Sequence, residues 1–221
     1  MSEAPAIPER RSVSASSRWP RSSVIALCRW QARRSWVVRA ASGTAWVVAA
    51  AAGWAVIRAR SDVAELIRPT LTALVWIGLG PVALVLAHDP EGRDRTEGVT
   101  DMLACRGVGG DELRRARFVA SVLEAIRVLG LPALLLSVAV FYHGVHARAA
   151  GLVAGILGVC LMTGGVVGLL ASACGHLAGR RGPGWMAALV IIPWLVADVL
   201  GDGLSLPTLI DAWLSRLVSA A

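Results

Sequence analysis

The chain has 221 residues, of which 56% are hydrophobic and only 17% are charged. Soluble globular domains average about 45–50% apolar and about 25% charged residues, so the composition excludes that class. All 22 basic residues are arginine, which excludes a P-loop lysine, a Schiff base and a catalytic lysine base in this chain. Four cysteines without a Cys-x-x-Cys pair are too few for a disulfide framework. The composition predicts an all-α, polytopic membrane protein.

The N-terminal region divides into two parts. Residues 1–20 are rich in Ser, Pro and Arg, which is typical of a disordered tail. The first apolar stretch begins near Ala40, too far from the start for a cleaved signal peptide. Within residues 21–39, Val24 and Cys28 share one helical side, and Arg29 and Arg33 lie roughly opposite. This pattern predicts an interfacial helix in the headgroup layer, although it also fits a simple positive flank of the first span.

Five apolar segments are predicted to cross the membrane. The fourth has 26 consecutive residues without a charge, where about 20 suffice to span a bilayer. The C-terminal segment 204–221 is apolar but contains Pro207, Asp211 and Arg216, so it is either a sixth span or a re-entrant or surface helix. The sequence therefore predicts about five to six transmembrane helices. The five spans are 40–57, 71–87, 118–142, 149–174 and 182–201.

The arginines outside these spans predict the orientation. With the N-terminus inside, the inner segments carry sixteen arginines and the outer segments carry five. Cytoplasmic loops are enriched in basic residues. We therefore expect a multi-pass protein of the bacterial inner membrane with a cytoplasmic N-terminus.

The long polar connection, residues 88–117, holds seven of the fifteen acidic residues. We expect a short helix over 97–105, a break at the glycines of 107–110, and a second helix with Asp111 as its N-cap. A surface helix joined by a glycine hinge to a spanning helix can transmit a movement from outside the membrane to the spanning helices. The pattern alone fits an ordinary charged loop equally well. Three arginines of the second helix are expected to reach toward lipid phosphates: Arg114, Arg115 and Arg117.

The run from Gly98 to Arg117 resembles the cytoplasmic loop of type-2 ABC exporter permeases. Gly98 matches the glycine of that family's motif, Asp101 its acidic position and Leu103 a leucine. The sequence departs from the motif at three positions, with Val99 in place of threonine, Gly107 in place of proline and Arg117 in place of lysine.

The resemblance implies a permease domain over residues 21–221, with no ATPase site of its own. A separate ATPase subunit would bind ATP and Mg²⁺ and grip the loop, and the permease would work as a homodimer or heterodimer in the lipid membrane, without nucleic acid. The residues that the resemblance assigns to this contact are Glu97, Gly98, Asp101, Met102, Leu103 and Gly107. The length and Gly130-Leu131-Pro132 are also similar to haem-exporter permeases of cytochrome c maturation.

Several polar and small residues inside the predicted spans allow more than one interpretation of their role. Glu124 and Arg127 are three apart and can pair on one helix face, either as a structural pair or as a gate or substrate contact. The Gly-x-x-x-Gly patterns of the fourth span allow close helix packing within the monomer or in a dimer. The histidines of His143-x-x-His146 lack acidic or cysteine companions, so we expect interfacial residues and no metal site.

No catalytic constellation is recognised in the sequence. The favoured hypothesis is a permease subunit that couples ATP hydrolysis by its partner to substrate movement. The alternatives are a membrane-embedded lipid-modifying enzyme and a structural anchor subunit. The sequence leaves open the substrate, the direction of transport and the composition of the dimer.

Overall fold

The structure is a computed structural model that describes residues 21–58, 63–88, 92, 96–143, 146–189 and 212, and leaves out the side chains of 63–65, 143 and 146–149. The predicted tail, most of the fifth span and all of segment 204–221 except residue 212 lie outside these residues. All regular structure in the described ranges is helical, which confirms the all-α prediction. In chain order the elements are α1 (Arg21–Arg34), α2 (Trp36–Arg58), α3 (Val63–Ala73), the π-helix η2 (Leu74–Leu79), α4 (Gly80–Leu86), α6 (Val99–Ala104), α7 (Gly110–His143), α8 (His146–Ala178) and the 3₁₀-helix η3 (Gly179–Arg181).

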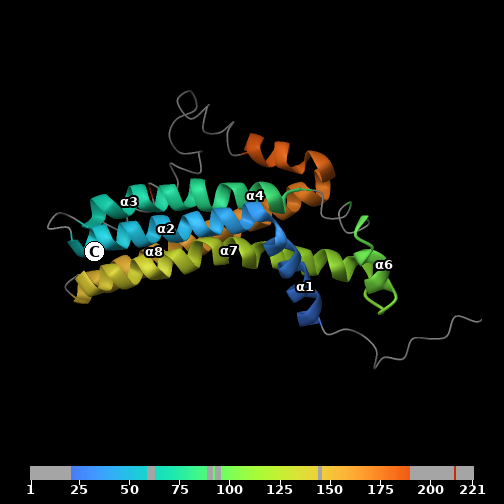
Figure 1. Ribbon diagram of the computed structural model, residues 1–221, viewed down its shortest axis with the longest axis horizontal. Helices are drawn as coiled ribbons and strands as arrows, with labels where there is room; N and C mark the ends of the chain where they lie inside the picture. The colour runs from blue at the N-terminus through green and yellow to red at the C-terminus, as the bar shows by residue number, and fades with distance from the viewer. Residues whose placement is uncertain are drawn as a thin grey trace, which may run out of the picture.

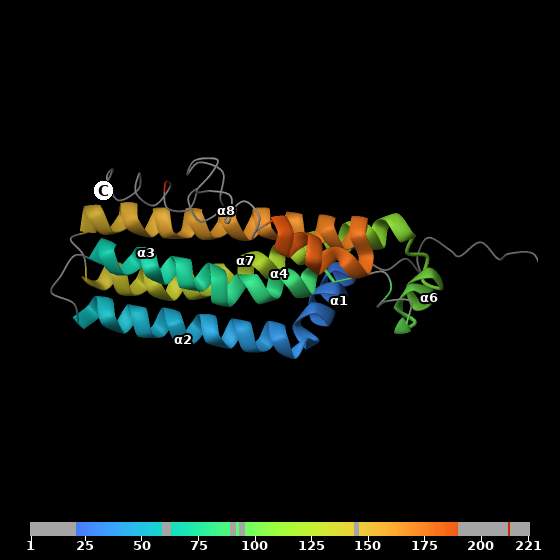
Figure 2. The same cartoon turned by 90° about the horizontal axis from the view of Figure 1, so that it is seen from above.

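Four segments of the described chain are long and apolar enough to cross a membrane, and they confirm the first four predicted spans. They are Trp36–Arg58, Leu66–Leu86, Gly110–Tyr142 and Ala150–Leu189. Figures 1 and 2 show the long helices lying side by side, with α1 and α6 at one end of the bundle. The chain is therefore a polytopic membrane protein, and we call the end with α1 and α6 the juxtamembrane end.

The fourth segment does not continue straight to Leu189. Residues 182–189 are helical, and Met186 packs beside Leu79 of the second span and Val167 of α8. Because Val167 lies well before the end of α8, the chain must turn back at η3 to bring Met186 beside it. A new helix therefore begins where the fifth span was predicted, although its remainder lies outside the described residues.

The second span is interrupted by a π-helical turn, and proline explains its position. Pro81 has no backbone N–H, so it cannot donate to the carbonyl of Ile77 four residues earlier. The N–H of Gly80 instead bonds to the carbonyl of Val75, five residues earlier, which is the π-helical pattern.

Helices α7 and α8 approach each other closely because α8 presents glycine. A Cβ built on Gly164 would lie 2.9 Å from Cα of Ile126, and one on Gly168 would lie 2.7 Å from Cα of Val122. These two glycines of the predicted small-residue pattern therefore pack within the monomer. A second close approach joins α2 to α7, where a Cβ on Gly53 would lie 3.2 Å from Cβ of Ala139.

Helix α7 is longer than the membrane requires. Its 34 residues extend about 51 Å, whereas the hydrocarbon layer is about 30 Å thick. Its N-terminal part therefore extends past the bundle, where α1 and α6 pack on it through a separate small core. This juxtamembrane cluster consists of Val24, Cys28, Leu103, Val108, Leu113, Ala116 and Ala120.

Candidate functional site

The short helix α6 ends in a turn at Gly107 that is closed by two backbone hydrogen bonds. Gly107 has a positive φ of 74°, the N–H of Val108 bonds to the carbonyl of Leu103, and the N–H of Gly107 bonds to that of Ala104, each at 3.0 Å. This pair of bonds is a Schellman motif, in which a hydrophobic contact usually joins the residues at its two ends. Leu103 and Val108 are both buried in the juxtamembrane cluster. The turn therefore fixes α6 to the tip of α7.

The six residues assigned to the loop contact do not share one environment. Asp101 and Met102 are exposed, whereas Leu103 is completely buried. Gly98 caps the start of α6 with a φ of 68°, and Glu97 accepts a hydrogen bond from Gln31 of α1 at 3.4 Å. Leu103 therefore positions α6, and of the assigned residues within this helix Asp101 and Met102 are exposed to a partner.

Helix α1 joins this loop to the membrane bundle. At its start, Arg21 forms an ion pair with Glu112 in the first turn of α7, at 3.4 Å. Two turns further, Cys28 is buried in the juxtamembrane cluster. This burial raises the pKa of its thiol, although the charge of Arg117 acts in the opposite direction. As predicted, the side of α1 with Val24 and Cys28 is its apolar contact face.

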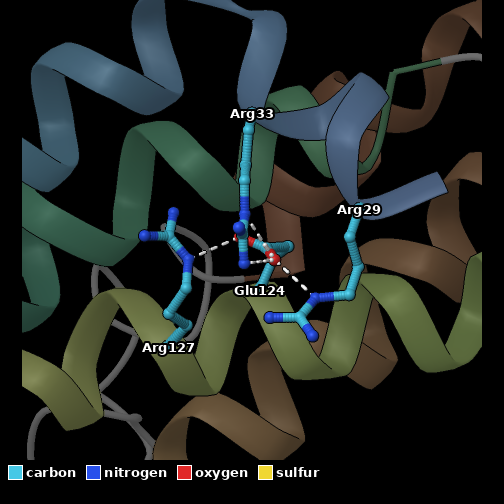
Figure 3. A network of polar contacts seen from close by, with 4 residues as sticks. All are labelled: Arg29, Arg33, Glu124 and Arg127. Carbon is cyan, nitrogen blue, oxygen red and sulfur yellow. Dashed lines mark hydrogen bonds and ion pairs between the residues drawn. The ribbon is translucent and has the colours of Figure 1, made fainter. Parts of the chain in front are cut away.

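The other side of α1 faces the carboxylate of Glu124 on α7, which accepts hydrogen bonds from three arginines. Arg29 donates from Nε to Oε1 at 2.7 Å, and Arg33 donates from Nη2 to Oε1 at 2.7 Å and from Nε to Oε2 at 3.1 Å. Arg127 donates from Nε to Oε2 at 2.6 Å. Figure 3 shows the three side chains converging on Glu124 from α1 and α7. We call these four residues the Glu124 network.

The network confirms the predicted pairing of Glu124 with Arg127 and adds two partners that the sequence did not predict. Arg29 and Arg33 bond to this carboxylate although they lie 95 and 91 residues away in sequence. The hydrogen bonds to Glu124 raise the pKa of Arg33, so this guanidinium is charged. Glu124 is 0% exposed, and a carboxylate can be buried only where such partners offset its lost hydration.

The position of Glu124 along α7 matches the edge of the hydrocarbon layer. Tyr142, 82% exposed near the far end of α7, is 18 residues away, or about 27 Å along the helix. An exposed Trp36 begins α2 at the same end of the bundle as Glu124, as expected for an aromatic residue at a membrane interface. The network therefore links α1 to the bundle at one end of the apolar part of α7.

Two further expectations for the loop need correction. Arg117 is buried rather than directed to lipid phosphates, whereas Arg114 and Arg115 are exposed. Helix α7 begins at Gly110, so Asp111 lies in its first turn and is not its N-cap. Proline is restricted to φ near −65°, so it could not form the turn that Gly107 forms.

Among the described residues, no group of three His, Cys, Asp or Glu side chains could hold a metal ion. The side chains of His143 and His146 lie outside that part of the chain. The predicted site residues thus form two regions joined by α1, namely α6 and the Glu124 network. No family model, curated protein or solved structure matches this chain.

Proposed function

We propose that this chain is the permease subunit of an ABC exporter in the bacterial cell membrane, with α6 as the helix that a separate ATPase subunit grips. The observation that carries the proposal is the placement of α6 at the tip of the overlong α7, outside the bundle, with Asp101 and Met102 exposed. An exposed methionine beside an acidic residue suits a partner groove with apolar and basic walls.

The contacts of α6 supply a path for force. The buried Leu103 and the Schellman turn hold α6 on α7 and α1, and Gln31 of α1 bonds to Glu97 beside α6. Further along α1, Arg29 and Arg33 hold Glu124 inside the bundle. Closure of the ATPase pair would move α6, α1 and the start of α7 together, and the spanning helices would rearrange to open a substrate path. ATP and Mg²⁺ belong to the ATPase, and a homodimer or heterodimer of permeases completes the transporter.

The first test is capture of the partner. Tagged chain purified in mild detergent should bring an ATPase with it, and the double variant Asp101→Ala, Met102→Ala should lose most of that ATPase and the transport that it drives. Arg115→Ala is the matched control, because this exposed arginine lies at the same end of the bundle but outside α6. Full transport by the double variant would reject the proposal, and substrate turnover by the chain alone would indicate a membrane enzyme.

A second test uses the natural Cys105, which is exposed at the end of α6, whereas Cys28, Cys160 and Cys174 are buried. A membrane-impermeant maleimide should label Cys105 in inverted vesicles and not in intact cells. Co-expression of the ATPase should protect Cys105 from labelling. Labelling from the outside would contradict the cytoplasmic position of α6.

A further inference from the structure

The Glu124 network carries more positive charge than its single carboxylate can neutralise. Three guanidiniums surround one carboxylate, which leaves a net charge of about +2 at the edge of the hydrocarbon layer. A low-dielectric boundary is a costly place for uncompensated charge, so a negative group from outside the described chain would be favoured there.

Two of these arginines also have N–H groups that Glu124 does not use, namely Arg29 and Arg127. Arg29 and Arg127 each bond to Glu124 through Nε, and Figure 3 shows the terminal nitrogens of Arg127 pointing away from the carboxylate. A guanidinium that uses Nε on one partner retains the N–H groups of both terminal nitrogens. The side chain of Arg127 is 24% exposed, so these groups are accessible from outside the bundle.

An apolar groove contains Arg127 as its charged residue. It has a volume of about 400 Å³ and lies between α7 and α8, with Leu123 and Ile126 on the juxtamembrane side of Arg127. The rest of its lining includes Gly130 and Leu134 of α7 and Leu157 and Leu161 of α8. From Arg127 to Leu134 the groove follows α7 away from the juxtamembrane end, which is toward the membrane interior. Gly130 keeps it open, because a Cβ there would meet only Cγ2 of Ile126, at 3.9 Å.

We infer that this groove binds one anionic phospholipid, with its phosphate on Arg127 and an acyl chain along Gly130, Leu134, Leu157 and Leu161. From Arg127 onward, the groove has a positive charge at the interface and then an apolar channel toward the bilayer centre, which is the order of these groups in a phospholipid. The lipid would supply the negative charge that the Glu124 network lacks. This binding is independent of transport, since it requires only that the bundle lies in a membrane.

Native mass spectrometry of the full chain, released from nanodiscs of phosphatidylglycerol and phosphatidylcholine, tests the inference. The wild-type chain should retain phosphatidylglycerol in preference to phosphatidylcholine. Arg127→Gln should reduce that preference about fivefold, the contribution of one arginine near an anionic leaflet. Gly130→Leu should abolish retention of either lipid by filling the groove.

Two control variants separate the site from general effects. Arg39→Gln removes an exposed arginine from the juxtamembrane part of α2, and Gly43→Leu enlarges an exposed glycine of α2 with no atom within 4 Å of its Cβ position. Both should retain phosphatidylglycerol as the wild type does, and size-exclusion chromatography checks that every variant folds. Equal loss in Arg39→Gln and Arg127→Gln, or unchanged retention in Gly130→Leu, would overturn the inference. Loss of a dimer mass in Gly130→Leu without loss of lipid would overturn it too, since a second copy would then occupy the groove.

Discussion

Helix α7 meets two neighbours in opposite ways. Against α8 it packs by shape, with glycines that bring the two backbones together. Against α1 it packs partly through the apolar juxtamembrane cluster and partly by charge, with one buried carboxylate held by arginines from both helices. The contact between α7 and α8 depends on volume, whereas the contact between α7 and α1 adds ionic partners to apolar packing.

The difference fits the surroundings of each contact. Lipid tails are as apolar as leucine side chains, so spanning helices gain from close van der Waals packing rather than from hydrophobic burial. At the hydrocarbon edge, water and headgroups compete for α1, and a network of charge-assisted hydrogen bonds is both stronger and more directional. Substitutions that change side-chain volume should therefore affect the α7–α8 contact most, and substitutions that remove a charge should affect the Glu124 network most.

The largest expected effect is at Glu124. Glu124→Gln keeps the shape of the side chain but leaves three guanidiniums around a neutral amide. Removing one partner of a buried ionic group costs about 3–5 kcal/mol, so we expect a loss of that order in the free energy of unfolding, measured by SDS titration. Arg127→Gln should cost less, about 1.5–3 kcal/mol, because Glu124 retains Arg29 and Arg33. Equal losses in the two variants would show that the network is not centred on the carboxylate.

The packing contact between α7 and α8 is tested by two glycines of α8 that lie three residues apart, one at the contact and one with open space around it. Gly168→Ala places a Cβ against the backbone of Val122 and should cost about 1–3 kcal/mol, as overpacking does. Gly165→Ala meets nothing within 4 Å and should be neutral or stabilising, because alanine favours the helix. Unfolding of both variants in the same detergent measures the difference. A destabilising Gly165→Ala would point to a contact with another copy of the chain.

The turn after α6 should respond to a smaller change. Gly107→Ala forces an alanine to a φ of 74°, which costs about 1–2 kcal/mol, whereas Gly109 has no positive φ and open space around it. Hydrogen exchange of the amides of residues 99–105 should accelerate in Gly107→Ala and stay unchanged in Gly109→Ala. Unchanged exchange in both variants would mean that the turn does not hold α6 in place.

Periodicity and composition predicted the spans because membrane-crossing helices need long uncharged runs, as in 149–174. The short helix of the loop and the glycine break after it were also visible, since Gly107 and Gly109 are local signals. The pair Glu124–Arg127 was predictable because three residues separate them on one helix. Local patterns of this kind determine which segments become helices and which near neighbours meet.

The partners from α1 could not be predicted by local patterns. Arg29 and Arg33 lie more than 90 residues from Glu124, so only tertiary packing brings them together. Their four-residue spacing places both on one face of α1, which was interpreted as a face for lipid headgroups. A single buried acid in an apolar helix with only one nearby arginine was the available signal that more cations were needed.

The smallest expected effect is a pH dependence at Cys28, and it reports on whether α1 stays on α7. Burial raises the pKa of this thiol, so the folded protein keeps the thiol proton to higher pH than the unfolded chain, in which a cysteine has a pKa of about 8.5. The unfolded state then binds fewer protons, and stability falls slightly as the pH rises through this value. N-ethylmaleimide, followed by peptide mass mapping, should modify the exposed Cys105 rapidly and Cys28 only after unfolding in SDS. Rapid modification of Cys28 in the folded chain would show that α1 separates from α7. The ion pairs between α1 and Glu124 would then break and re-form in the folded protein.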